Sequence, residues 1–244
     1  MMICEAKEIV SGFADILFPP KCAACETVLI HDREYPFCPE CLSTISFTAS
    51  PLCTSCGLPF TETAGANHLC EDCILSPPPF SIARSLGKYE AALLDTIHLF
   101  KYHGKISVGE DMGRMMAKAC YDSLVIENYS LIIPVPLHLK RLKERGFNQS
   151  LVLARQISKK FSIPIDFIAL RRKIRTEAQV SLSGRQRMAN VRGAFEAADR
   201  SRIEGKKILL IDDVYTTGST AKECSKMLMK SGAKEVAVLT LARA

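Results

Sequence analysis

Residues 208–220, ILLIDDVYTTGST, constrain the fold of this chain more than any other segment. Four apolar residues suit a short buried strand, and two adjacent carboxylates, Asp212 and Asp213, stand where that strand is expected to end. A small polar loop follows and leads into an amphipathic helical stretch. In open α/β sheets, ligands bind beyond the carboxyl ends of the strands, and a small-residue loop that opens a helix directs N–H groups at an anion. The segment therefore predicts a site for a ligand with both hydroxyls and phosphate, such as a sugar phosphate.

A simpler interpretation of the same segment is a strand, a turn and a helix capped by Ser or Thr. That interpretation explains the apolar run and the hydroxyls. It does not explain why two carboxylates, four hydroxyl residues and a glycine occur in this order. We therefore favour the binding site.

Strand-like and helix-like patterns alternate through the second part of the chain. Apolar runs predict strands, or in the first case a hairpin arm, over 81–89, 131–135, 166–170, 207–211 and 235–241. Helical spacing predicts helices over 91–102, 108–124, 148–161, 183–190 and 222–231. Such alternation is typical of an α/β fold, with a mostly parallel sheet covered by helices on both faces.

Four CxxC pairs precede this region: Cys22/Cys25, Cys38/Cys41, Cys53/Cys56 and Cys70/Cys73. Two thiolates at this spacing share one tetrahedral metal ion, and two pairs complete a Cys4 site. Twelve residues separate the first two pairs and thirteen the last two. This near-equal spacing favours two consecutive Zn²⁺ ribbons; a crossed arrangement, first pair with third and second with fourth, is the alternative. A disulfide scaffold is a further alternative, but no export signal is visible that would take the chain to an oxidising compartment.

Charge and proline content divide the chain into two expected domains. Residues 1–80 contain three Lys or Arg against ten Asp or Glu, whereas residues 81–244 contain 29 against 16. Three consecutive prolines, 77–79, mark a linker between them. We therefore predict a cysteine-rich domain over 1–78 and an α/β domain over 79–244. No run of eighteen apolar residues indicates a membrane span, and the expected location is the cytoplasm.

The segment 133–149, IPVPLHLKRLKERGFNQ, is the second candidate binding region. An apolar strand runs into a proline-bounded turn and then into a cluster of Lys and Arg. Backbone amides and cations at the end of a strand suit a diphosphate. A solvated basic helix face is the alternative for this cluster taken alone.

Residues 208–220 resemble the signature of the type I phosphoribosyltransferases, which bind phosphoribosyl pyrophosphate (PRPP). The chain as a whole is similar to the ComF family (competence protein F, including GntX-like members), which joins a double zinc ribbon to a phosphoribosyltransferase domain. The match is carried by the four CxxC pairs, by PVPxxxxR and RGFNQ at 134–141 and 145–149, by TxxQxxLSxxxRxxNVxxAF at 176–195, and by DDVYTTGST.

The resemblance implies a role for each candidate residue. Asp212 and Asp213 would contact the ribose hydroxyls, with Asp213 as the candidate general base. The 5-phosphate would lie in the loop of Thr216, Thr217, Gly218, Ser219 and Thr220. The diphosphate, with its Mg²⁺, would lie against Val135, Pro136, Leu137, Lys140 and Arg141. The basic segment 171–195 would close over PRPP and exclude water.

The resemblance also implies a role in natural transformation, with single-stranded DNA and proteins of the competence machinery as partners. The basic clusters at 101–105 and 140–145 suit phosphate contacts, and Tyr102 and His103 would add stacking. Two alternatives stay open: an active phosphoribosyltransferase on an unidentified acceptor without a DNA role, and a zinc-ribbon adaptor with a vestigial PRPP site.

Overall fold

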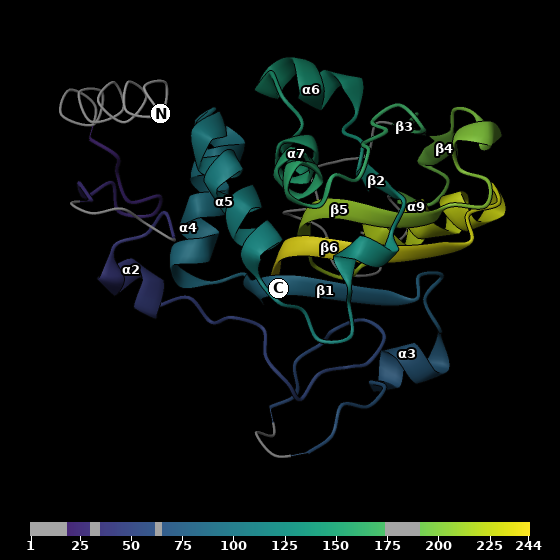
Figure 1. Cartoon of the computed structure of the whole chain (residues 1–244), viewed down its shortest axis with the longest axis horizontal. Helices are drawn as coiled ribbons and strands as arrows, with labels where there is room; N and C mark the ends of the chain where they lie inside the picture. The colour runs from purple at the N-terminus through teal and green to yellow at the C-terminus, as the bar shows by residue number, and fades with distance from the viewer. Residues whose placement is uncertain (1–18, 30–34, 62–64, 174–190) are drawn as a thin grey trace, which may run out of the picture.

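Four parallel strands form the central sheet, in the order β1-β6-β5-β2 (Figure 1). In chain order they are β1 (Ile82–Lys88), β2 (Leu131–Pro134), β5 (Lys207–Tyr215) and β6 (Glu235–Arg243). The computed structural model describes residues 19–29, 35–61, 65–173 and 191–244. All four residues of β2 are buried, which explains why its sequence is continuously apolar rather than alternating.

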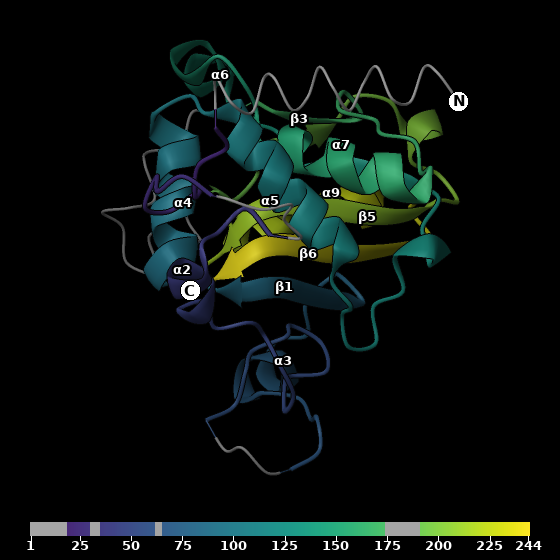
Figure 2. The same ribbon diagram turned by 60° about the vertical axis from the view of Figure 1, so that its left-hand side comes forward.

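Helices cover both faces of the sheet, as predicted. The first face carries α4 (Ala91–Tyr102), α5 (Ile106–Lys118) and α7 (Gln149–Phe161), and the opposite face carries α9 (Ser219–Lys230) (Figure 2). Alternate residues of β5 supply the two cores: Leu209 and Ile211 pack with the first group of helices, and Ile208 and Leu210 pack with α9. A small antiparallel pair, β3 (Leu170–Arg172) and β4 (Phe195–Ala197), joins the α9 side. The other elements are α2 (Pro39–Ser43), α3 (Glu71–Leu75), α6 (Leu139–Arg145) and the 3-10 turns η1 (Ile126–Asn128) and η3 (Arg200–Arg202).

Several predicted boundaries are wrong, and one predicted strand is mostly a turn. Strand β5 continues to Tyr215, because its pairing with β6 continues to Arg243, so the acidic pair lies inside the strand rather than after it. Helix α9 begins at Ser219, and the helix predicted over 108–124 ends at Lys118. Most of the strand predicted over 166–170 is a turn, in which Asp166 accepts two backbone N–H groups. The helix predicted over 183–190 lies outside the described residues.

The cysteine-rich segment is attached to β1, one of the two edge strands of the sheet. Three backbone N–H···O bonds join them: Thr48 to Leu86 at 3.0 Å, Lys88 to Ser46 at 2.8 Å, and Ala83 to Ser55 at 2.7 Å. Figure 1 shows α2 and α3 on this side of the sheet. The domain boundary at residue 78 stays a prediction.

No helix in the described part of the chain is long and apolar enough to cross a membrane.

Candidate functional site

The acidic pair lies near the carboxyl end of β5 and is held by two helices. The hydroxyl of Ser150, in the first turn of α7, donates to Asp212 Oδ1 at 3.0 Å, and the backbone N–H of Asp213 donates to the same oxygen at 2.9 Å. The ammonium of Lys101, at the end of α4, lies 2.9 Å from Asp213 Oδ2. The two carboxylates therefore have different partners, although they are adjacent in sequence.

Among the residues that the structure describes, Lys101 is the cation that forms an ion pair with this acidic pair. Burial, and then the charge of Asp213, raise the pKa of Asp212 to about 7. The hydrogen bonds from the backbone N–H of Asp213 and the hydroxyl of Ser150 act in the opposite direction but are outweighed. Burial lowers the pKa of Lys101, but the charge and hydrogen bond of Asp213 outweigh it, so that the pKa of this lysine is raised. The pair is therefore an acceptor-rich site in which Asp213 is paired with Lys101 and Asp212 has a pKa near neutral pH.

The loop after β5 has the geometry of an anion site. Gly218 adopts a left-handed conformation with φ 71° and precedes Ser219, the first residue of α9. Thr217 Oγ1 lies 2.6 Å from Ser219 Oγ and accepts the Ser219 N–H at 3.4 Å. The first N–H groups of a helix have no partner within it, and the helix dipole adds positive potential there. Thr216 and Thr220 flank this turn, so the five candidate loop residues lie between β5 and the first turn of α9.

Tyr215 explains why the loop requires glycine. A Cβ atom at position 218 would overlap the Tyr215 hydroxyl and lie 2.9 Å from ring atom Cε1. On the ring itself, the guanidinium carbon of Arg243 lies 4.5 Å from the centroid. Arg243 also donates to the carbonyl of Cys56 at 2.7 Å. A continuous set of contacts therefore joins the cysteine-rich segment to the loop after β5.

The residues predicted to hold a diphosphate fall into two groups. Val135 follows β2 at the same sheet edge: its N–H donates to Ile211 C=O at 2.9 Å, and its carbonyl accepts from Asn148 at 3.1 Å. Pro136 is buried and Leu137 half-buried beside it. Val135 therefore lies beside Ile211, the residue before the acidic pair.

Lys140 and Arg141 differ from the expectation. Both lie in helix α6, not in a turn, because His138 caps the helix by accepting the Lys140 N–H at 3.2 Å. Lys140 is exposed and lies 3.8 Å from Glu144 one turn later. The basic-helix alternative thus describes the local structure correctly. Arg141 still contributes positive charge near the site, because it lowers the pKa of Arg172, after the larger effect of burial.

The eight cysteines form two clusters, which decides between the consecutive and crossed pairings. Sulfur atoms of Cys22, Cys25, Cys38 and Cys41 lie within 4.8 Å of one another, and so do those of Cys53, Cys56, Cys70 and Cys73. The consecutive arrangement is confirmed. The described cysteines form no disulfide.

The sulfur geometry fits tetrahedral zinc. A Zn–S bond of about 2.3 Å requires sulfur atoms about 3.8 Å apart, and the Cys25–Cys38 and Cys56–Cys70 pairs are both at 3.7 Å. Backbone N–H groups of Cys56 and Cys70 donate to Cys53 Sγ at 3.4 Å, as expected for thiolates. Burial opposes ionisation there, but these N–H donors prevail and lower the pKa of Cys53 to about 6.

The two clusters differ in exposure and position. In the first, Cys25 is exposed and Cys41 half-buried, whereas all four cysteines of the second are buried. The first cluster belongs to the core beneath α4, and the second to the core that contains α9. The clusters therefore lie on opposite faces of the sheet, with β1 between them.

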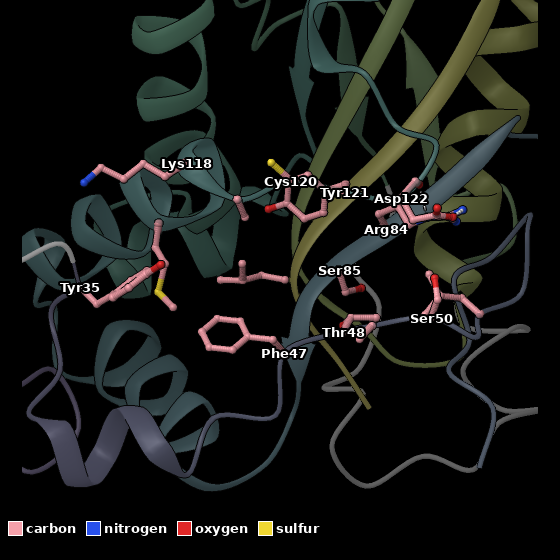
Figure 3. A pocket seen from close by; sticks show the side chains of 15 residues that line it. Tyr35, Phe47, Thr48, Ser50, Arg84, Ser85, Lys118, Cys120, Tyr121 and Asp122 are labelled. Carbon is pink, nitrogen blue, oxygen red and sulfur yellow. Dashed lines mark hydrogen bonds and ion pairs between the residues drawn. The ribbon is translucent and has the colours of Figure 1, made fainter. Parts of the chain in front are cut away.

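A cavity of about 300 Å³ lies between residues 47–52, β1 and the end of α5 (Figure 3). Figure 3 shows Phe47 opposite Lys118 and Cys120, with Arg84 and Asp122 at one end. The buried guanidinium of Arg84 donates to the carbonyls of Asp122 at 2.7 Å, Ala83 at 2.8 Å, Thr54 at 3.3 Å and Cys53 at 3.5 Å. The guanidinium of Arg84 is already hydrogen-bonded to these carbonyls, and no predicted site residue lines this cavity. We therefore place the candidate anion site at the carboxyl ends of the strands.

Sequence reasoning misses four residues that shape the site: Ser150, Lys101, Tyr215 and Arg243. Of these, Lys101 appears in the sequence only as part of a basic cluster. Ser150, Lys101 and Arg243 act through residues distant in sequence, so no local pattern identifies them. Tyr215 lies within 208–220, but its packing against position 218 becomes visible only in the structure. Most of the closing segment predicted over 171–195 lies outside the described residues, which resume at Val191.

Known proteins match most of the chain. It is 32% identical over 228 residues to competence protein F of Haemophilus influenzae, covering 92% of this chain and 97% of that protein. It is 32% identical over 210 residues to DNA utilization protein YhgH of Escherichia coli K12, covering 84% and 89%. It is 26% identical to competence protein ComFC of Bacillus subtilis, covering 84% of this chain and 83% of that protein. Residues 13–74 match the family model of the double zinc ribbon domain, and residues 148–244 that of the phosphoribosyl transferase domain.

Proposed function

Because the chain belongs to the competence protein F family, we propose that it binds PRPP with Mg²⁺ at the carboxyl edge of its sheet and handles incoming single-stranded DNA during natural transformation. The observation that carries the proposal is the acidic pair of β5 placed directly before an anion-binding loop at the start of α9. One ligand with vicinal hydroxyls and a phosphate satisfies both parts.

Each part of PRPP has a matching group at this edge. Asp212 and Asp213 accept hydrogen bonds from the ribose 2- and 3-hydroxyls. The loop from Thr216 to Thr220 and the first turn of α9 hold the 5-phosphate. The diphosphate lies against the backbone of 135–137, with Lys140 and Arg141 of α6 supplying charge beyond it. Mg²⁺ arrives with the diphosphate, which provides the oxygen ligands that this ion prefers.

Zn²⁺ in the two cysteine clusters has a structural role. All eight ligands are cysteines, so neither site keeps an open position for substrate. Part of the folding free energy of the cysteine-rich segment then comes from metal binding.

Calorimetric titration of the zinc-loaded protein with PRPP and Mg²⁺ tests the proposal. The Asp212→Asn/Asp213→Asn double variant should lose PRPP binding, because it replaces the two carboxylates that are proposed to accept hydrogen bonds from the ribose hydroxyls. Glu71→Gln/Asp72→Asn is the matched control, since it neutralises two adjacent exposed carboxylates in α3. Native protein that does not bind PRPP would refute the function and leave the zinc-ribbon adaptor as the explanation.

A second candidate function is turnover, in which a nucleophile attacks C1 of PRPP and diphosphate departs. The pKa of Asp212, raised to about 7, favours turnover, because a carboxylate whose pKa is near 7 can accept a proton at physiological pH. PRPP-dependent release of diphosphate, measured with an excess of each nucleobase or of an oligonucleotide, tests turnover separately from binding.

A further inference from the structure

Two basic segments that are far apart in sequence meet beside the acidic pair. One is the end of α4, around Lys101 and Tyr102, and the other is α6. The guanidinium carbon of Arg145 lies 5.4 Å from the centroid of the Tyr102 ring. Figure 2 shows α6 just beyond the carboxyl end of α4. This contact turns two charged helix ends into one surface with an aromatic ring at its centre.

The ring is supported by a set of neighbouring side chains. His98 and Tyr102 pack edge to face with centroids 5.7 Å apart, and His98 Nε2 lies 3.0 Å from the Tyr89 hydroxyl. Tyr89 is fixed in turn by its N–H bond to the Arg243 carbonyl at 2.6 Å. We call Tyr89, His98, Tyr102 and Arg145 the Tyr102 platform. It fixes the position of a ring that is nevertheless 61% exposed.

The platform adjoins the candidate sugar-phosphate site. Lys101, the residue before Tyr102, pairs with Asp213 at 2.9 Å. Burial lowers the pKa of Arg145, and the charge of Asp213 opposes that effect, which places the guanidinium near the carboxylate. A planar group stacked on Tyr102 would therefore lie beside the groups assigned to ribose.

The chemistry of this surface matches a nucleobase with an exposed face. Every base stacks on an aromatic ring, and a guanidinium adds cation–π attraction. A duplex hides those faces, whereas a single strand presents them. We propose that the Tyr102 platform stacks a base of single-stranded DNA beside Asp213, so that the strand and the sugar-phosphate ligand occupy neighbouring subsites. The proposal rests on the function proposed above and assigns residues to its DNA partner.

The surrounding charges predict how binding responds to salt. Three lysines here pair with carboxylates: Lys101 with Asp213, Lys105 with Glu26, and Lys140 with Glu144. Within the described ranges, the cations of this surface that form no ion pair are Arg141, Lys143 and Arg145. Three phosphate contacts give a slope of log Kobs against log salt of about −2, whereas six would give about −4. Stacking therefore carries a large share of the affinity.

Fluorescence polarisation with a labelled thymidine oligonucleotide tests the proposal on the full zinc-loaded chain. Tyr102→Ala should weaken binding at least about tenfold, the loss typical of one stacked base, whereas Tyr102→Phe should retain it. Phe167→Ala is the matched control, because Phe167 is 60% exposed but lies in the turn before β3, outside the platform. Equal oligonucleotide affinities for Tyr102→Ala and Phe167→Ala would overturn the proposal. Duplex binding as tight as single-strand binding would also overturn it.

Two further measurements separate this proposal from the proposed function. The PRPP affinity of Tyr102→Ala should stay within about twofold of that of the native protein, because Tyr102 contacts none of the residues proposed to bind PRPP. If native protein bound no PRPP while Tyr102→Ala still lost DNA, the PRPP function would fail and the platform would stand. If Tyr102→Ala instead impaired only diphosphate release driven by a free base, with DNA affinity intact, the platform would belong to a free acceptor base and our proposal would be wrong.

Discussion

Replacing Gly218 with alanine perturbs the phosphate loop at a position that the structure defines closely. The added Cβ would overlap the Tyr215 hydroxyl and lie 2.9 Å from Cε1 of its ring. Carbon atoms pack at about 3.5–4.0 Å, so clearing Cε1 alone requires the ring or the loop to move by about 0.6–1.1 Å, and clearing the closer Cζ and hydroxyl requires more. Binding sites tolerate misplacement of about 0.5 Å. We therefore expect PRPP affinity to fall at least about tenfold.

The same substitution also costs stability, by two separable effects. A non-glycine residue in the left-handed region costs roughly 1–2 kcal/mol, and overpacking adds about 1–3 kcal/mol. Gly205→Ala isolates the first effect, because Gly205 has φ 72°, close to the 71° of Gly218, and a Cβ added there would meet no atom within 4 Å. The difference between the two variants is then the steric term.

Urea unfolding and PRPP calorimetry on both variants provide the measurement. Gly205→Ala should lose about 1–2 kcal/mol and bind PRPP normally. Gly218→Ala should lose about 2–5 kcal/mol and bind weakly. Equal stability losses, together with unchanged PRPP affinity in both variants, would show that Tyr215 does not restrict the loop as argued.

Three further predictions follow from the charges and the metal clusters. The pKa of Asp212 is raised from 3.8 to about 7, so the fold favours its protonated form and the free energy of unfolding falls as pH rises from about 4 to 7. Asp212→Asn should therefore raise stability by roughly 2–4 kcal/mol at pH 8 but not at pH 4; equal urea midpoints of the two proteins at pH 8 would contradict this. Lys101→Met leaves a largely buried carboxylate unpaired and should cost about 3 kcal/mol, whereas Lys105→Met, in an exposed pair, should cost under about 1 kcal/mol. Similar losses of stability in thermal unfolding would count against the pairing of Lys101 with Asp213. A chromogenic chelator should remove zinc in two phases, first from the cluster that contains an exposed cysteine and later from the buried one; a single phase would refute that order.

The sequence predicts those parts of the site that local pattern encodes. Residues 208–220 predict a buried strand, its acidic end and an anion loop because a strand, a loop and a helix start each have a local signature. The consecutive cysteine pairing is predictable for a similar reason, since near-equal spacing reflects two repeated knuckles. The same logic places Val135 at the sheet edge, directly after an apolar strand.

The remaining parts depend on contacts between distant residues. The turn expected at Lys140 is a helix, because His138 supplies a cap that the basic composition conceals. Lys101 meets Asp213 across more than a hundred residues, and Arg243 meets Cys56 across 187. No periodicity or motif encodes such pairs, because they arise only when the strand order is fixed.

The attachment of the cysteine-rich segment to β1 also bears on self-association. An edge strand with unpaired N–H and C=O groups is a template for pairing with another chain. Residues 46–55 occupy three such groups of β1, and this strand is almost wholly buried. Chelation that unfolds the zinc clusters would uncover that edge together with its apolar side chains. Aggregation detected by light scattering should therefore follow zinc loss, even while the circular dichroism spectrum shows that the secondary structure of the rest of the sheet is retained. The metal ions would then prevent intermolecular β-pairing, because they keep the cysteine-rich segment folded over the β1 edge of the sheet.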